Sequence, residues 1–289
     1  MIMKTKIFIL FLILGATISN ISAQYDNFGQ MWGIENSILG KSKVRGDAGY
    51  VFSIISYKPK DDTLYNFQRN AINLNFDINF YKHLHARTSF YIDLSTSPVK
   101  PPFLSDLFYQ FGWYDWHNKS FSFGYENYQP NNIFRKEGDR KTDWAENFRR
   151  GMLFASFNYD LLQKNSALKY DKTSQIRLVP AIRYFYEYSD KYGIVKGGNH
   201  KIVLTTAARW TIIKNIYVEG AVYYYPDKSS KLPWDADFTY GFGMFDWRAF
   251  KMNFSYGNWI ANRFPWNEKQ MTYYGFLNGE FKATFTWAL

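Results

Sequence analysis

The chain of 289 residues contains no cysteine, and beyond its first residues it has no long apolar run. The absence of cysteine excludes a disulfide framework and thiolate chemistry. No later stretch approaches the ~20 apolar residues that a membrane-spanning helix requires, and the mean hydropathy is −0.39. Hydropathy does not detect strands that cross a membrane, however, because residues facing lipid and residues facing a polar interior alternate and cancel. A chain that crosses a membrane with strands is therefore not excluded.

The first residues have the order of a secretory signal peptide. Lysines near the start precede an apolar run from Ile7 to Gly15, and small residues lead up to Ala23. This order predicts a signal peptide over residues 1–23. Residues 24–46 lack alternation and are expected to form an N-terminal extension that is periplasmic or lumenal.

Aromatic residues are abundant, at 21% of the chain, with 27 Phe, 24 Tyr and 10 Trp. Soluble domains rarely carry so many, whereas a membrane barrel uses aromatic side chains at both of its interfaces. A secreted, soluble, β-rich carbohydrate-binding protein is the alternative explanation of this composition.

The last residues, Phe276 to Leu289, alternate with a period of two. Their odd positions are apolar or small and most of the even ones are polar, which predicts a strand with one apolar and one polar face. The final strand of a soluble antiparallel sandwich has the same pattern, so this strand alone does not separate the two folds.

Twelve segments have the character of strands, and several have the ~10 residues that a tilted strand needs to cross a bilayer. No internal repeat is evident, so one domain is expected over 47–289. The segments are 47–58, 68–81, 84–95, 104–116, 119–128, 148–160, 174–188, 201–212, 215–226, 235–248, 250–260 and 274–289.

The connections between these segments alternate between long and short, with one exception at 161–173. Short periplasmic turns and longer extracellular loops are typical of outer-membrane barrels, whereas Greek-key sandwiches have no reason to alternate. An even strand number also returns the chain to the side from which it started. We therefore predict an all-β fold, a closed antiparallel transmembrane β-barrel of 12 strands. The short connections are Lys82-His83, His117-Asn118, Ile213-Lys214 and Arg248-Ala249.

These features together resemble Gram-negative outer-membrane β-barrel proteins. The resemblance is carried by the leader MKTKIFILFLILGATISNISAQ, by the alternating segments, and by the terminal FKATFTWAL, which is similar to the C-terminal targeting strand of that class. The last residue is Leu289 where that class usually has an aromatic. Twelve-stranded members include small porins, a nucleoside channel, autotransporter barrels and a phospholipase, so the resemblance implies the architecture but no single function.

If the apolar faces meet lipid, the polar faces line a lumen that is rich in arginine. Guanidinium groups pair with carboxylates and phosphates, which suits passage of anionic or sugar-like solutes. Equally, the charges of a small barrel can pair with one another and fill the lumen. The residues expected in the lumen are Arg87, Arg177, Arg183, Arg209, Lys282, Glu126, Glu187 and Glu219.

Two long connections, 129–147 and 261–273, carry charges and aromatics that are candidates for contact with a solute. The first can constrict or cap a pore, meet a partner, or simply be solvated near lipopolysaccharide. Trp266 can stack on a sugar ring or anchor at the membrane interface. The candidates in these connections are Arg135, Arg140, Arg263 and Trp266.

The sequence favours no catalytic or metal site. The phospholipase class requires His-x-Ser, which does not occur, and His117 with Ser120 has the wrong spacing. His83 and His85 have a spacing that can seat a metal, but no third ligand is evident in the sequence, so a turn-flanking pair is the better interpretation. We expect no enzyme activity, no cofactor and no metal.

The net charge is +10, and removal of Lys4 and Lys6 leaves about +8. The basic residues are scattered, which disfavours nucleic acid as a partner. The expected function is therefore an outer-membrane channel for small polar, anionic or sugar-like solutes, in contact with lipid and lipopolysaccharide. A non-conducting barrel that acts as a structural or accessory subunit with envelope protein partners remains open.

Overall fold

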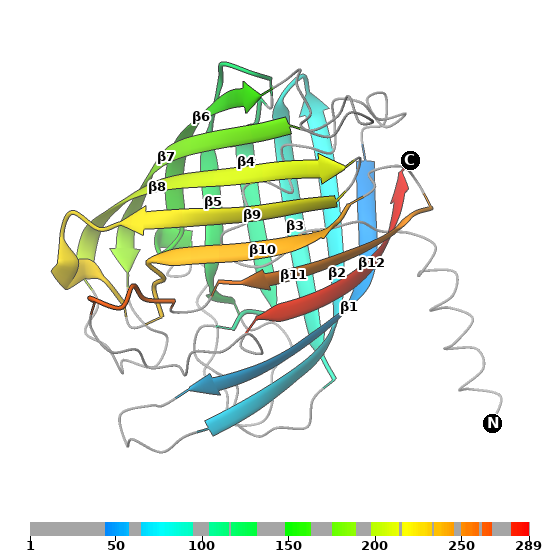
Figure 1. The fold of residues 1–289 in the computed structure, drawn as a ribbon, viewed down its shortest axis with the longest axis horizontal. Helices are drawn as coiled ribbons and strands as arrows, with labels where there is room; N and C mark the ends of the chain where they lie inside the picture. Colours follow the sequence, from blue (N-terminus) through cyan, green and yellow to red (C-terminus); the bar gives the residue numbers. More distant parts are fainter. Residues whose placement is uncertain are drawn as a thin grey trace.

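The computed structural model is a closed barrel of twelve antiparallel strands, in which each strand pairs with its neighbours in the sequence and β12 pairs with β1 (Figure 1). This confirms the predicted fold class. The described residues are 44–57, 65–94, 104–115, 117–131, 148–162, 175–188, 198–213, 216–232, 234–245, 250–259, 262–267 and 279–288. The strands are β1 (Val44–Tyr57), β2 (Tyr65–Tyr81), β3 (Leu84–Asp93), β4 (Leu107–Trp113), β5 (Ser120–Asn131), β6 (Met152–Leu162), β7 (Gln175–Tyr188), β8 (Gly198–Ile213), β9 (Ile216–Tyr224), β10 (Phe238–Met244), β11 (Met252–Asn258) and β12 (Glu280–Ala288), with a 3₁₀ turn, η2 (Lys228–Ser230), before β10.

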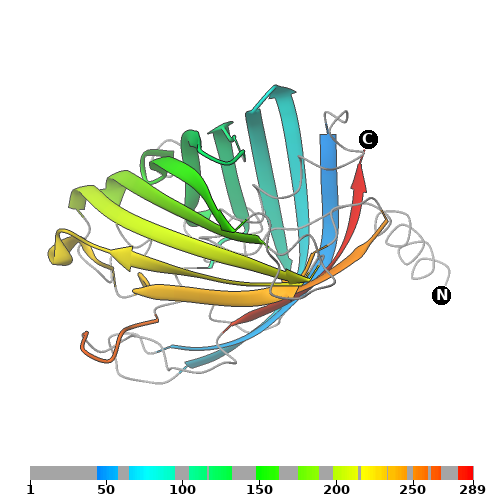
Figure 2. The same ribbon diagram turned by 45° about the horizontal axis from the view of Figure 1, so that its top comes forward.

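The barrel closes where the last strand meets the first, as the red and blue arrows of Figure 2 show. Asp47 lies opposite Thr286, and Ser53 lies opposite Glu280. β1 begins at Val44, earlier than the expected start at residue 47. Closure pairs the backbone groups that an open edge would leave without partners in a bilayer.

Polar side chains point inward and apolar side chains outward. On β12 the even residues, such as Lys282 and Thr284, are buried, whereas Phe281 and Phe285 on the odd face are partly exposed. On β6, Met152, Phe154 and Ser156 are among the inward residues. An exterior of exposed Phe, Leu, Ile, Tyr and Val is consistent with an outer-membrane barrel and is unfavourable in water.

No helix among the described residues is long and apolar enough to span a bilayer. This finding does not bear on crossing by strands.

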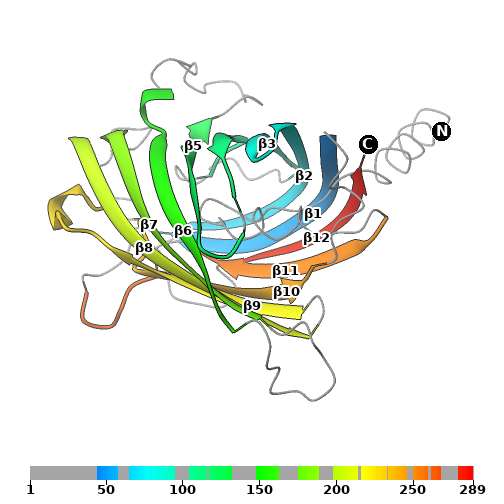
Figure 3. The same cartoon turned by 90° about the horizontal axis from the view of Figure 1, so that it is seen from above.

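The short connections gather at one end of the barrel, which we call the turn end; the opposite end is the loop end. The turn at Lys82-His83 joins β2 to β3 as expected. The connection from β4 to β5 is longer than the expected pair of residues, because β4 stops at Trp113 and β5 starts at Ser120. Figure 3 shows the strands from above as a curved wall around the interior.

The two halves of the barrel repeat each other, contrary to the expectation from sequence. Every strand pair of β1 to β6 recurs in β7 to β12 with the same register, including the pairs that join the halves. The corresponding pairs are Val51–Ala71 and Arg183–Val203; Asp77–Arg87 and Arg209–Glu219; Arg87–Gln110 and Glu219–Gly241; Phe111–Tyr125 and Phe242–Tyr256; Gly124–Phe154 and Ser255–Lys282; Phe154–Arg183 and Lys282–Val51.

With the register known, the repeat can also be followed in the sequence. YQFGWYDW at 109–116 corresponds to YGFGMFDW at 240–247, and GMLFASFNYDL at 151–161 corresponds to GEFKATFTWAL at 279–289. The other strands retain only the alternation that any barrel has. The repeat is difficult to recognise from the sequence alone, because all strands share the same alternation. Only the register shows which positions are equivalent.

The repeat extends to an unusual pair of aromatic joints on the outside of the barrel. Tyr125 and Tyr256 both face outward, yet they are only 7% and 2% exposed. Each ring lies over the glycine that precedes the next strand, because a Cβ added to Gly151 or Gly279 would come within 2.5 Å of it. Rings that cover glycines fill the groove that the missing side chain leaves and strengthen strand pairing.

The neighbours of the two tyrosines also correspond. Phe111 stacks on Tyr125 with centroids 5.2 Å apart, and Phe242 stacks on Tyr256 at the same 5.2 Å. Asn127 and Asn258 each donate from the side-chain amide to two tyrosine hydroxyls. The joints are therefore a shared structural device of both halves.

Candidate functional site: the barrel interior

The interior is a charge-balanced set of buried ionic side chains. Among the described residues, eight buried side chains are basic, six of them arginines, and eight are acidic, so the arginines of the interior are balanced by carboxylates. The expected set had omitted several carboxylates on the inward faces of β1, β2 and β6. The basic residues are Arg69, Arg87, Arg177, Arg183, Lys201, Arg209, Arg263 and Lys282, and the acidic ones are Asp47, Asp77, Asp106, Glu126, Asp160, Asp235, Asp237 and Glu280.

A row of four charges crosses the turn-end half of the barrel on β6 to β9. Arg177 donates to both carboxylate oxygens of Asp160, at 2.6 and 3.0 Å. Arg209 donates from Nε and Nη2 to Glu219, at 2.9 and 2.6 Å. Arg177 and Arg209 lie opposite each other on neighbouring strands. The two guanidinium groups can be adjacent because each is neutralised by a carboxylate on the strand at its other side, Asp160 for Arg177 and Glu219 for Arg209.

The equivalent pair in the first half has the opposite polarity. Asp77 on β2 accepts from Arg87 on β3, with contacts of 2.5 and 2.7 Å, whereas the second half has Arg209 on β8 and Glu219 on β9. His85 lies beside the same carboxylate, with Nε2 3.2 Å from Asp77 Oδ1. Both halves therefore have an inward-facing pair of opposite charges at this register, with the cation on β3 in the first half and on β8 in the second.

A second cluster lies nearer the loop end, between β2, β3 and β12. Arg69 Nε donates to Asp93 at 2.9 Å and lies 3.8 Å from Glu280. Lys282 Nζ is 3.5 Å from the same Glu280 and donates to the hydroxyl of Tyr91 at 3.1 Å. Arg69 also lies over the ring of Tyr91, 4.3 Å from its centroid. Both cations of the cluster are thus neutralised within the barrel.

The remaining expected lumen residues are also inward-facing. Arg183 on β7 is 3% exposed, and its guanidinium lies 5.9 Å from the ring centroid of Tyr223. Glu126 on β5 is fully buried. Glu187, near the loop end of β7, is only partly buried and lies 3.6 Å from Arg149.

At the loop end, the β9–β10 connection and residues 262–267 form a polar cluster. Arg263 donates to the backbone carbonyls of Asp235 and Leu232, so it is a buried structural residue. Lys201 and Lys231 pair with Asp235 and Asp237, respectively. Of these charged residues, only Arg263 was expected to meet a solute, and two of its hydrogen bonds go to the protein's own backbone.

Trp266 lies beside this cluster but is 77% exposed. It stacks on Phe264 with centroids 4.8 Å apart and an interplanar angle of 11°. The other two candidates from the long connections, Arg135 and Arg140, lie outside the described residues.

Asp237, at the loop end, accepts several hydrogen bonds. Burial by itself would raise its pKa. Hydrogen bonds from the amide of Asn267, from Lys231 and from the backbone N–H of Phe264 outweigh burial, and the pKa lies below its ordinary value. The ionised form of Asp237 is therefore favoured by the folded barrel.

This shift predicts an acid-sensitive loop end. Because the pKa of Asp237 is lower in the folded than in the unfolded chain, its ionised form stabilises the fold at pH values above about 4. That contribution is lost as the pH falls through the folded pKa. Denaturant titrations from pH 7 to pH 2 are expected to show Asp237→Asn less stable than wild type at neutral pH, with a difference that shrinks below about pH 4. A difference that is constant across this range would contradict the assignment.

The sequence identified the arginines of the interior better than their partners. The expected lumen set did not include Asp77, Asp160 or Arg69. Arg69 lies within the expected strand 68–81, and the period of two places it on the same face as Asp77. Which cation pairs with which carboxylate follows from the register and not from the phase.

In comparisons with known proteins, the chain matches no family model, and no curated protein is significantly similar to it.

Proposed function

We propose that the protein is an outer-membrane barrel whose interior is closed by its own ion pairs, and that it serves the envelope as a structural or accessory barrel. Its apolar exterior contacts membrane lipid, with lipopolysaccharide on the outer side. Its tasks are carried out at its ends and its outer surface. One observation carries the proposal: the four arginines expected to line a channel are only 3–4% exposed.

The charges of the interior support the same conclusion. A lining that attracts anions needs guanidinium groups with free donors and an excess of positive charge. Arg87, Arg177 and Arg209 already donate to carboxylates, and the buried charges of the described residues balance. Separating the two partners of such a pair costs free energy, because a buried charge without its partner is strongly unfavourable.

A channel for anionic or sugar-like solutes is the second candidate. The observation that favours it is the direct neighbourhood of Arg177 and Arg209. An anion that displaced Asp160 and Glu219 would meet two guanidinium forks side by side. Passage of an anion would require the ion pairs Asp160–Arg177 and Arg209–Glu219 to separate.

Planar-bilayer recording separates the two candidates. The refolded protein, with insertion verified by heat-modifiable gel mobility, is expected to give no conductance steps. A double variant with Asp160→Ser and Arg177→Ser removes one pair together with its bulk and is expected to leak small ions, because side chains close the barrel. Anion-selective steps from the wild type would overturn the proposal in favour of the channel.

A further inference from the structure

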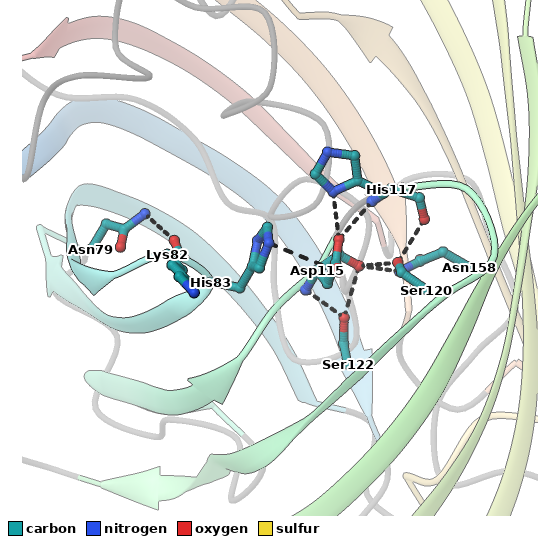
Figure 4. A network of polar contacts seen from close by, with 8 residues as sticks. All are labelled: Asn79, Lys82, His83, Asp115, His117, Ser120, Ser122 and Asn158. Carbon is teal, nitrogen blue, oxygen red and sulfur yellow. Dashed lines mark hydrogen bonds and ion pairs between the residues drawn. The ribbon is translucent and has the colours of Figure 1, made fainter.

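Three side chains with metal-binding atoms meet at the turn end of the barrel, outside the interior described above (Figure 4). His83 lies in the β2–β3 turn, and Asp115 and His117 lie in the β4–β5 connection. Nδ1 of His117 is 2.7 Å from Oδ1 of Asp115, and Nε2 of His83 is 3.8 Å from Oδ2. The candidate ligand atoms all lie within 4.8 Å of one another. In the sequence, His83 and His85 have a spacing that can seat a metal, but His85 points into the barrel toward Asp77.

The backbone that carries these side chains is held from several directions. The N–H of Tyr114 donates to the carbonyl of His83 at 2.8 Å, which ties the two connections together. The carbonyl of Asp115 accepts from the hydroxyls of Ser120 and Ser122 and from the side-chain amide of Asn158 (Figure 4). Ligands on a fixed backbone lose little freedom when a metal binds.

The internal repeat places no histidine at the equivalent positions of the second half. Aligned with the second half, His83 corresponds to Asn215 and His117 to Arg248, while Asp115 corresponds to Asp246. The β4–β5 connection nevertheless has its counterpart, because Lys119 and Phe250 have the same positive φ, 61° and 62°. Their N–H groups donate to the equivalent carbonyls of Asn158 and Thr286, at 2.7 and 2.6 Å. The histidines of the first half therefore have no histidine counterpart in the sequence of the second half, and they call for a separate explanation.

We propose that His83, Asp115 and His117 bind one divalent transition-metal ion, such as Zn²⁺ or Co²⁺. Two imidazoles and a carboxylate are a ligand set that zinc commonly has in proteins, with water at the remaining position. Imidazole nitrogen selects such ions over Mg²⁺ and Ca²⁺, which prefer oxygen ligands. Tetrahedral ligands of zinc lie about 3.3 Å apart, so binding requires the contact from Asp115 to His117 to lengthen and that to His83 to shorten.

The bound ion would join the β2–β3 turn to the β4–β5 connection. The two connections belong to successive hairpins of the barrel and are otherwise linked here by the Tyr114 backbone bond and by ring contacts such as that of His83 with His117, whose centroids are 5.5 Å apart. Because the ion binds only the folded arrangement, it stabilises the turn end of the barrel.

Metal binding is tested on the full-length barrel refolded in detergent, stripped of metal with a chelator. Zn²⁺ titration against a chromophoric competitor is expected to give one ion per chain, and Co²⁺ is expected to give a visible absorption band of a low-coordinate site. His83→Gln, Asp115→Asn and His117→Gln are each expected to weaken binding about tenfold or more. His200→Gln, at the loop end and bonded to Tyr184, is the matched control and is expected to bind like wild type.

A second measurement separates binding at this site from misfolding of a variant. Saturating Zn²⁺ is expected to raise the unfolding temperature of wild type and His200→Gln but not that of His117→Gln, whose replaced side chain is 54% exposed. Folding of each variant is verified by heat-modifiable mobility. The proposal would be overturned if the wild type showed no stoichiometric binding, or if folded His83→Gln and His117→Gln bound the metal as tightly as the wild type.

Discussion

Replacement of Asp160 by asparagine is expected to destabilise the folded barrel by about 3–5 kcal/mol, because it leaves a buried arginine without its carboxylate. The Asp160 side chain is 1% exposed, and its two oxygens both accept from Arg177. Arg177 lies opposite Arg209, so the variant also leaves two cations adjacent with a single carboxylate, that of Glu219. Like charges at this separation in a low-dielectric interior repel strongly.

The measurement is reversible unfolding in lipid vesicles, followed by tryptophan fluorescence across a denaturant titration. The matched control replaces both partners, Asp160→Leu with Arg177→Met, and is expected to lie close to wild type, because an apolar pair of similar volume removes both desolvation penalties. Equal losses for the single and double variants would show that packing, and not charge, decides the stability of the row.

Replacement of Tyr256 by alanine is expected to cost about 3 kcal/mol, which is the lower part of the range for removing a packed aromatic ring. The ring is 2% exposed although it faces outward, because it covers Gly279 and packs against Phe242 and Phe281. Lipid can refill part of the space, which is why the lower part of the range is expected. Tyr125→Ala is expected to have an effect of similar size, since the internal repeat places the same joint there.

The same unfolding assay measures both joints. Tyr256→Phe keeps the ring and is expected to retain most of the stability, while Gly279→Val places a side chain within about 2.4 Å of the ring and is expected to destabilise the joint from the other side. A negligible effect of Tyr256→Ala would mean that packing of the ring over Gly279 does not contribute to the stability of the barrel.

Much of the fold follows from local patterns. The twelve strands lie near their expected positions, and the last strand pairs with the first. Side chains of a strand alternate between two faces, so the phase that places Arg87, Arg177, Arg183 and Arg209 inside can be read from each strand alone. The same reasoning could not give the phase of β6, where Met152 and Phe154 are apolar residues that face inward.

The pairing of the interior required the tertiary structure. Asp160 meets Arg177, and Asp77 meets Arg87, only at the observed registers, and a register is set between two strands and by the turn that joins them rather than within any one strand. The phase of a strand therefore shows that an arginine faces inward. It does not show whether that arginine lines a channel or pairs with a carboxylate. The balance of buried charge is the result of these registers.

The sequence by itself determined the strands, their number and, except on β6, the faces they turn inward, because a period of two is a local property of the chain. Only the tertiary structure decided the partners of the interior charges, the repeat of the two halves, and the meeting of His83 with Asp115 and His117. The ion pairs and the repeat depend on how neighbouring strands are aligned, and the meeting of the two histidines depends on a contact between successive hairpins. Their geometry is set by register and closure, which no single segment of the chain encodes.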